Sequence, residues 1–344
     1  MKYQTANQTI PYHYLNVVIP PGNRSYSPAW QRVLAQLGSY TAQVVQKLRL
    51  RPTTVVLLAQ TSTHLLVRIS TANQHVVLVL APELHLAGEV AFSRAMAAHN
   101  LPAPRLVEYD LSRTLIPCDY LIEYYVGGHS AEQLVQPYLL RGLARQTGRV
   151  LQRMHRIGMP GWARPNQVGR WLEPDWLPIL TNLHHRLAPM PIARLVFGDN
   201  DSDMLASVLE QPILADVQPR LMHGNISPRA VRCTVNEAAR LEAITDPGPL
   251  IGGDGMLDLA RGLDPVYPDA WRAGLLEGYS SAVMPGPNEM ERLRYLRILT
   301  CTWSACQRYI RAESPQAARD EALALFHGNI HPFQVESESI TSGG

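Results

Sequence analysis

Gly127 and Gly128 divide this sequence into a part with the short period of β-strands and a part with the longer period of helices. Before the two glycines, short runs rich in leucine and β-branched residues alternate with polar, turn-like segments, which is typical of antiparallel strands. These runs are Val55–Leu58, Leu65–Ile69, Val76–Leu80, Arg105–Tyr109 and Tyr120–Tyr125. The change of period at the glycines predicts a β-rich lobe followed by a helical lobe.

Helical periodicity dominates the chain after Gly128. The helices expected there are Ala131–Ile157, Asp175–Leu187, Asp201–Leu209, Asp269–Val283 and Asn288–Ala312, with short strands at Ala230–Thr234 and Leu241–Thr245. Two earlier helices are expected at Glu83–His99 and Ser27–Leu48. The second of these begins where Ser27 can cap a helix and Pro28 suits its first turn.

The sequence therefore predicts an α+β chain with four regions. They are an N-terminal arm and helix at 1–50, a β-rich N-lobe at 51–126, a helical C-lobe at 127–336 and a disordered tail at 337–344. Two lobes also suit a length of 344 residues, because single cores tend to split above ~250–300 residues.

The composition argues against several classes of partner. The net charge is +2 and no block of Lys and Arg stands out, so neither nucleic-acid nor membrane-surface binding is indicated. The four cysteines lack Cys-x-x-Cys spacing, which predicts reduced core thiols in place of a metal site or disulfides. No signal-peptide core opens the chain, and no run approaches the ~18 apolar residues of a membrane span. We expect a soluble, cytoplasmic protein.

Two short segments carry the chemical information. His223-Gly224-Asn225 precedes the two short predicted strands, and Ile244-Thr245-Asp246-Pro247-Gly248 begins at the end of the second of them. Each has an ordinary structural interpretation: His223 as a buried, hydrogen-bonded histidine, and Asp246 as a turn-capping carboxylate that is as plausible as a metal ligand. A second copy, His327-Gly328-Asn329-Ile330, has no such strand after it, and we interpret it as coincidence.

The order of these and other weak motifs resembles the family of aminoglycoside phosphotransferases, choline kinases and fructosamine kinases, from about Val55 to Ile310. The other matching segments are Leu101–Leu106, the hinge-like Tyr120–Gly128, Gly148–His155, Gly253-Asp254 and Leu257–Ala260. The resemblance implies a bilobal protein-kinase-like fold. It also implies ATP and Mg²⁺ as cofactors if the protein is active, and no cofactor if it is not.

The resemblance implies a role for each matching residue between His223 and Asp258. The family's general base falls on Asn225, and its two metal ligands fall on Ala230 and Asp246. His223 and Asp258 take the positions that support the loop. Phosphoryl transfer needs the phosphates held, the metal coordinated and the acceptor hydroxyl oriented. An amide is no base and an alanine is no ligand, so this chain departs from the pattern at both Asn225 and Ala230.

The nucleotide positions depart as well. The family's phosphate-binding lysine falls on Val79, and the helix glutamate that would position it is Glu89, left without an obvious partner. Glu123 and Tyr125 lie in the hinge-like segment that would bind the nucleotide. The loop at 60–64 lacks the glycine that lets backbone N–H groups approach phosphates. Loss of a general base costs ~10²–10⁴-fold, and loss of a preorganised donor costs ~10²–10³-fold.

We interpret the chain as an aminoglycoside-phosphotransferase-like pseudokinase that is catalytically impaired and acts by binding an unknown small molecule or protein partner. The alternative is an active ATP-dependent phosphotransferase with an alcohol acceptor, in which Asp246 and Asp254 hold the metal. A third class is a structural subunit whose cleft is filled by side chains. Fold analogy alone does not decide among them.

Overall fold

The computed structural model describes residues 27–61 and 63–334, and these form two compact units. Unit 1 holds the described residues up to Ala97, with Pro104–Val126 and Pro165–Arg170. Unit 2 holds Ala98–Ala103, Gly127–Arg164 and the described residues from Trp171 onward. The predicted arm at 1–26 and the predicted tail at 337–344 lie outside the described residues.

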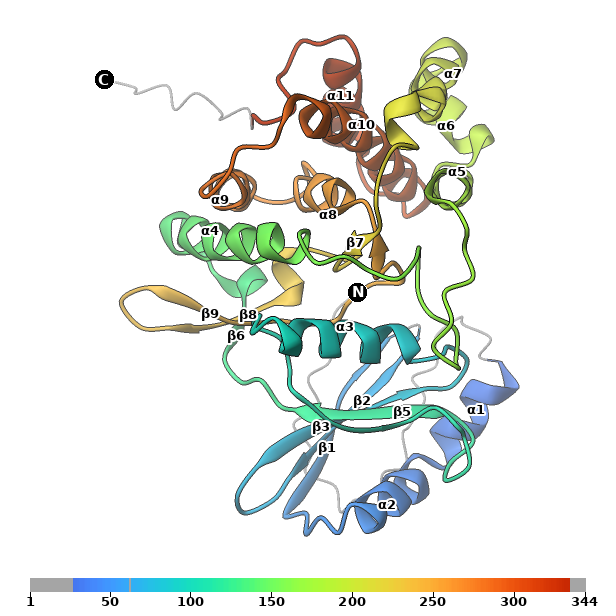
Figure 1. Ribbon diagram of the computed structural model, residues 1–344, viewed down its shortest axis with the longest axis vertical. Coiled ribbons are helices and arrows are strands. Elements are labelled where there is room, and N and C mark those ends of the chain that lie inside the picture. The colour runs from blue at the N-terminus through green and yellow to red at the C-terminus, as the bar shows by residue number, and fades with distance from the viewer. Residues whose placement is uncertain (1–26, 62, 335–344) are drawn as a thin grey trace. The chain divides into compact units, whose positions relative to one another are not determined.

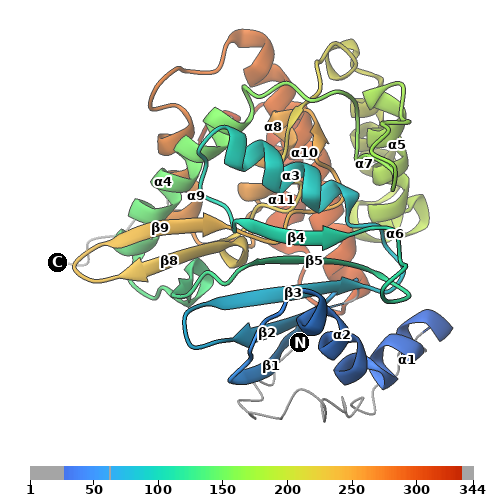
Figure 2. The ribbon, with the colours of Figure 1, turned by 60° about the horizontal axis from the view of Figure 1, so that its bottom comes forward.

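Unit 1 is a five-stranded antiparallel sheet with helices on both faces (Figure 1). The strands lie in the order β1-β2-β3-β5-β4, which Figure 2 shows along the sheet. Their bounds are Thr54–Gln60 (β1), Leu65–Ser70 (β2), His75–Ala81 (β3), Leu106–Asp110 (β4) and Asp119–Tyr124 (β5). The helices are Pro28–Ala35 (α1), Leu37–Lys47 (α2) and Ala87–Ala98 (α3).

The alternation along β2 assigns each side chain to one face of the sheet, because successive residues of a strand point to opposite sides. Leu65, Val67 and Ile69 are fully buried in the core shared with α1 and α2. Leu66 and Arg68 therefore point to the other face, which α3 covers in part. This second face carries most of the nucleotide positions predicted from the sequence.

The predicted helix from Ser27 to Leu48 is two helices. Its start is confirmed, since the Ser27 hydroxyl accepts a hydrogen bond from the Trp30 N–H at 3.3 Å and Pro28 follows. The prediction of one continuous helix is wrong, because Gln36 leaves the helical region at φ −113° and ψ 13°. The break lets the buried faces of α1 and α2 both pack on the sheet.

Unit 2 is mainly helical, so the predicted α+β class with a strand-rich N-terminal part is confirmed. Its helices are Pro137–Met154 (α4), Trp176–Leu187 (α5), Met190–Phe197 (α6), Asp199–Ala206 (α7), Gly255–Gly262 (α8), Asp269–Tyr279 (α9), Pro287–Ile310 (α10) and Gln316–Phe326 (α11). Its strands are His129–Ser130 (β6), Arg220–Leu221 (β7), Val231–Val235 (β8), Ala239–Ile244 (β9) and Gly252–Gly253 (β10).

Four helices of unit 2 differ from expectation, and one of them is α8, which the sequence analysis did not predict. The helix predicted from Ala131 begins only at Pro137, because Gln136 is extended at φ −82° and ψ 118°. α6 and α11 were not predicted, since neither segment shows a long apolar stripe. α4 and α9 lie side by side (Figure 1), and their axes approach closely because a Cβ atom on Gly278 would collide with the Arg145 carbonyl.

Two expectations about individual residues can be compared with the structure. All four cysteines lie in the described part of the chain, and each is buried and unpaired, as predicted. The second His-Gly-Asn segment ends a helix: His327 caps α11, Gly328 has φ +75°, and the Asn329 N–H bonds to the Ala324 carbonyl at 2.8 Å. Among the described residues, no helix combines the length and the apolar character that crossing a membrane requires.

His184 on α5 gives unit 2 a pH-dependent stability. Burial, with the charge of His185, lowers the pKa of His184 to about 4, and its Nδ1 accepts a hydrogen bond from Trp303 Nε1 at 3.0 Å. The unfolded chain therefore takes up a proton first, and stability falls as the pH drops from about 6.5 towards 4. Between these two pH values the free energy of unfolding should fall by about 3 kcal/mol.

Urea unfolding at both ends of this pH window should show a smaller loss of stability in His184→Asn, whose amide oxygen can still accept from Trp303. The control His129→Asn, an exposed histidine elsewhere in unit 2, should behave as the parent protein does, and an equal loss in all three proteins would contradict the assignment.

Candidate functional site

The His223-Gly224-Asn225 loop is held by its backbone. Asp258 on α8 is fully buried, and its carboxylate accepts hydrogen bonds from the N–H groups of His223 and Gly224, the latter at 2.7 Å. Gly224 has φ +72°, and a Cβ atom there would collide with the Leu250 carbonyl. Arg261 Nη1 donates to the Gly224 carbonyl at 2.5 Å. The loop conformation thus depends on a glycine, on the buried carboxylate of Asp258 and on the half-buried guanidinium of Arg261.

Charge and hydrogen bonding keep Asp258 ionised. Burial by itself would raise the pKa of Asp258, but the hydrogen bond and charge of His155, with a contribution from His223, lower it on balance. His155 Nε2 lies 3.3 Å from the Asp258 carboxylate, and His155 Nδ1 lies 2.9 Å from the Tyr279 hydroxyl. A chain of contacts therefore runs from Tyr279 through His155 to the carboxylate that holds the loop.

His223 is placed as a structural residue. Its side chain is fully buried, and its Nε2 donates to the Thr245 carbonyl at 3.0 Å. Burial lowers the pKa of His223, so the ring is neutral at pH 7. The bond ties the loop to the end of β9, next to Asp246. The arrangement fits support of the loop better than proton transfer.

Asn225, Ala230 and Asp246 lie close to the hydrogen bond between His223 and Thr245. The exposed Asn225 amide donates to the Asp246 backbone carbonyl at 3.5 Å. The Ala230 carbonyl accepts from the Thr245 N–H at 2.7 Å. Asp246 is exposed and has φ +61°, a left-handed conformation that is uncommon outside glycine. Of these three side chains only that of Asp246 is a carboxylate, and the part of the chain that the structure describes holds no cluster of three or more potential metal ligands.

Val79 lies in an apolar environment. On β3 it pairs with Leu66 of β2 and Leu121 of β5. It packs against a cluster that includes Leu86 and Val90 beside α3. A phosphate would find no positive charge at this position.

Glu89 has a partner that the sequence did not reveal. Its Oε1 lies 3.7 Å from His64 Nε2, and both side chains are nearly buried, at 11% and 13% exposure. His64 directly precedes β2, at the end of the loop that in the family would bind phosphates. The expectation that Glu89 lacks an obvious partner is therefore wrong: the loop itself supplies one.

Arg68 is the residue that the sequence analysis missed. The strand register places Arg68 of β2 opposite Val77 of β3, and Val77 opposite Glu123 of β5. The Arg68 guanidinium lies over the Tyr125 ring, 5.3 Å from its centroid, and its buried Nε has no hydrogen-bond partner among the described residues. Two predicted nucleotide-binding residues, Glu123 and Tyr125, thus share one face of the sheet with an arginine. Its signal was visible, since Arg68 is the sole lysine or arginine in β1, β2 and β3.

Comparison with known proteins places the chain in a family. The family model described as "Phosphotransferase enzyme family" matches residues 54–296, well over half of the chain. The crystal structure of aminoglycoside phosphotransferase APH(4)-Ia is similar over 85% of this chain and 99% of its own, with 13% identity and a TM-score of 0.58. A thermostable mutant of that enzyme, in a ternary complex with AMP-PNP and hygromycin B, is similar over 83% and 97% of the two chains, with 13% identity and a TM-score of 0.57.

A third similar structure is the GDP complex of aminoglycoside 2′-phosphotransferase-IIIa, which covers 85% of this chain and 97% of its own at 14% identity and a TM-score of 0.55. A comparison with curated protein sequences found no match. Likeness at such low identity shows the fold, which is protein-kinase-like, and the family model carries the assignment further. The chain belongs to the phosphotransferase enzyme family.

Proposed function

We propose that this protein has lost phosphoryl transfer and acts by binding, as a pseudokinase of its family. The observation that carries the proposal is the contrast within one loop. The groups that hold the loop, Asp258, Gly224 and Arg261, make their full set of contacts. The position that would react with an acceptor is Asn225, whose amide is engaged with a backbone carbonyl.

Mg-ATP does not fit the residues of unit 1. Val79 provides an apolar surface where phosphates need a cation. Arg68, stacked on Tyr125, covers the hinge residue that would contact the nucleotide. The backbone N–H groups of Thr63 and His64 donate to the Thr61 hydroxyl at 3.2 and 2.9 Å, so they are not left bare for phosphate oxygens. Three separate departures on one face of the sheet all disfavour the nucleotide.

The proposed partner is a small molecule or a protein, met in the cytoplasm. The overall charge and the fold of the family support neither a nucleic-acid nor a membrane partner. The relatives in complex with AMP-PNP, GDP and hygromycin B bind these ligands in their own sites. For this chain Mg²⁺ and ATP belong to the alternative below.

The alternative is an active small-molecule phosphotransferase with a rearranged site. One observation favours it: the Asp246 carboxylate is exposed and lies beside the His223-Gly224-Asn225 loop, whose backbone Asp258 holds. In that case Asp246 would hold the metal and another group would act as base. Turnover that disappears in Asp246→Ala would establish this alternative.

Calorimetric titration tests the proposal. We expect Mg-ATP to bind with a Kd weaker than ~1 mM, and thermal-shift curves with Mg-ATP and with EDTA to coincide, because only a ligand that binds the native state raises stability. Arg68→Ala should leave Mg-ATP binding weak, since Val79 still offers no charge. The matched control is Arg105→Ala, whose guanidinium lies 5.6 Å from the Tyr124 ring centroid. Low-micromolar affinity that Arg68→Ala abolishes would show that Arg68 has replaced the lysine, and the proposal would be wrong.

A further inference from the structure

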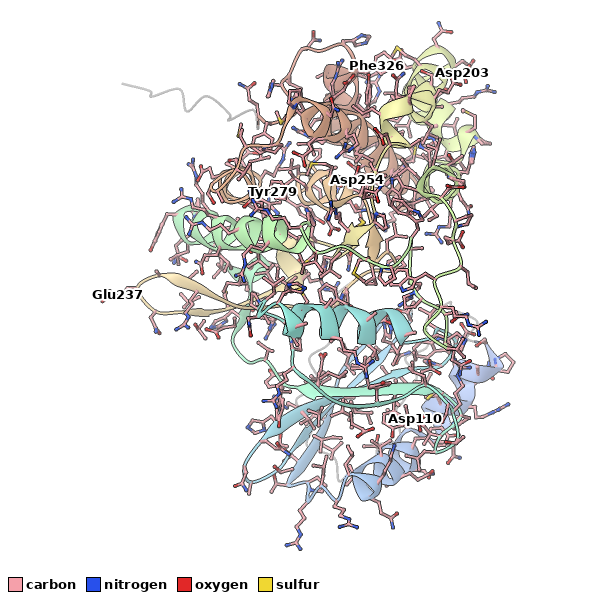
Figure 3. The ribbon with its side chains drawn as sticks, in the orientation of Figure 1. Asp110, Asp203, Glu237, Asp254, Tyr279 and Phe326 are labelled. Carbon is pink, nitrogen blue, oxygen red and sulfur yellow. The ribbon has the colours of Figure 1, made fainter. Side chains whose placement is uncertain are left out.

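Unit 2 contains a cavity of about 520 Å³ whose walls include neither Asn225 nor Asp246. It is formed by the ends of α4 and α9, the starts of α8 and α10, and the segment 216–220. Figure 3 labels two residues of its wall, Asp254 at the start of α8 and Tyr279 at the end of α9. The volume lies within the ~300–1,000 Å³ of small-molecule sites.

Three of the charged groups in the wall have partners within the protein. Arg292 Nε lies 3.2 Å from the Asp254 carboxylate, whose other oxygen accepts from the Met256 N–H at 3.0 Å. The Glu289 carboxylate accepts from the Gly286 N–H at 2.8 Å. Arg292 and Asp254 neutralise each other, whereas Glu289 keeps its negative charge.

Two arginines of the wall have no carboxylate partner and could bind an anion. Arg156 and Arg220 line the cavity, and Arg220 Nη1 donates to the Arg156 carbonyl at 3.4 Å, so the two residues are neighbours. Neither guanidinium has a carboxylate within ion-pair distance among the described residues. The wall as a whole holds three arginines (Arg156, Arg220, Arg292) and three carboxylates (Asp216, Asp254, Glu289), so the two guanidinium groups without a carboxylate partner, and not a net positive charge, would attract an anion. Guanidinium groups bind carboxylates and phosphates through paired hydrogen bonds.

The lip of the cavity is apolar and open. Val283 and Met284 line it and are 58% and 57% exposed. An inorganic ion would leave these side chains in water, whereas a ligand with an apolar group would cover them. Burial of such surface contributes ~25 cal/mol per Å².

The cavity also shares a wall with the support of the His223-Gly224-Asn225 loop. His155 and Tyr279 both line it. They are the two residues whose contacts lead to Asp258, which holds the loop through the N–H groups of His223 and Gly224. A ligand that restrains this wall restrains Asp258, because packed hydrogen-bond networks transmit such coupling between sites.

We propose that this cavity binds a small organic anion that carries an apolar group, and that its occupant stabilises the His223-Gly224-Asn225 loop. The proposal rests on the proposed binding function and supplies its ligand class. It does not depend on whether Mg-ATP binds, because the cavity lies wholly in unit 2.

Titration of the full chain with phenyl phosphate tests the site. We expect saturable binding that weakens about tenfold in Arg156→Ala and in Arg220→Ala, since each removes a charged hydrogen bond. The matched control Arg149→Ala, an exposed arginine of α4 outside the cavity, should bind as the parent does. Inorganic phosphate should bind more weakly and benzyl alcohol not at all. Absence of binding, or equal binding by all variants, would overturn the site.

Hydrogen exchange tests the coupling. With phenyl phosphate bound, the amides of His223 and Gly224 should exchange several-fold more slowly. Asp258→Asn, at a residue that does not line the cavity, weakens the link from His155 to the loop; it should retain binding and lose this protection. Binding without protection in the parent protein would overturn the coupling. Turnover with Mg-ATP would instead contradict the proposed loss of catalysis and leave the cavity assignment intact, so the two failures are distinguishable.

Discussion

Asp258→Ala should lower the free energy of unfolding by about 3–5 kcal/mol, as the loss of one partner in a buried charged network does. The variant leaves the N–H groups of His223 and Gly224 without acceptors in a fully buried environment and removes the partner of His155. Asp258→Asn, which keeps the volume and one acceptor oxygen, should lose less. Urea unfolding followed by circular dichroism measures both.

The stabilisation that Asp258 provides should be lost at low pH. Because the pKa of Asp258 is lowered from its ordinary value of 3.8, its stabilising contribution is complete above that value and is lost as the pH falls through the lower folded pKa. The surface control is Asp203→Ala, whose carboxylate is 61% exposed and 3.6 Å from Arg194; Figure 3 labels it on α7. Exposed pairs contribute ~0–1 kcal/mol. A loss in Asp258→Ala no larger than in Asp203→Ala would mean that Asp258 does not hold the loop.

The unmodified protein should transfer no detectable phosphoryl group from Mg-ATP to aminoglycosides, choline or sugar amines. Restoring the family residues one set at a time separates the causes. Asn225→Asp with Ala230→Asn provides a base and an oxygen ligand beside Asp246, so Mg²⁺ binding should improve. Turnover should stay undetectable, because coordination needs only the new ligands while transfer also needs the phosphates clamped.

Val79→Lys is the step on which turnover should then depend. The new ammonium enters a cluster lined by Leu66 and Leu121, so the variant should be less stable unless Glu89 turns from His64 to pair with it. Radiolabelled transfer assays of the double and triple variants measure the gain, and Asp246→Ala in the triple variant is the negative control. The losses are not additive, so only the triple variant is expected to turn over. Robust turnover by the unmodified protein, abolished by Asp246→Ala, would contradict the pseudokinase proposal.

The sequence predicted the elements whose pattern is local. The runs at Leu65–Ile69 and Val76–Leu80 alternate or are continuously apolar over single strands, and the structure places β2 and β3 over both. The break at Gln36 escaped prediction because the apolar face continues across it, and only the packing of α1 and α2 on one core shows the bend.

The positions of the site followed from the order of motifs, but their partners did not. The contact of Asn225 with Asp246 lies within the motif pair that the sequence singled out. The approach of His64 to Glu89 and the stacking of Arg68 on Tyr125 depend on strand register and on where α3 lies over the sheet. Register is set by pairing between distant segments, and no local pattern encodes it.

The way in which the loop is held bears on how such a protein can evolve. The hydrogen bonds to Asp258 come from the backbone of His223 and Gly224, and the side chain at 225 points to solvent. The side chain at 225 makes one long hydrogen bond to the Asp246 carbonyl at the surface, so folding places little demand on the identity of this residue, and selection for catalysis is the force that would preserve an acid there. Once that selection is relaxed, an aspartate can drift to asparagine in a single neutral step, with no compensating substitution elsewhere in unit 2.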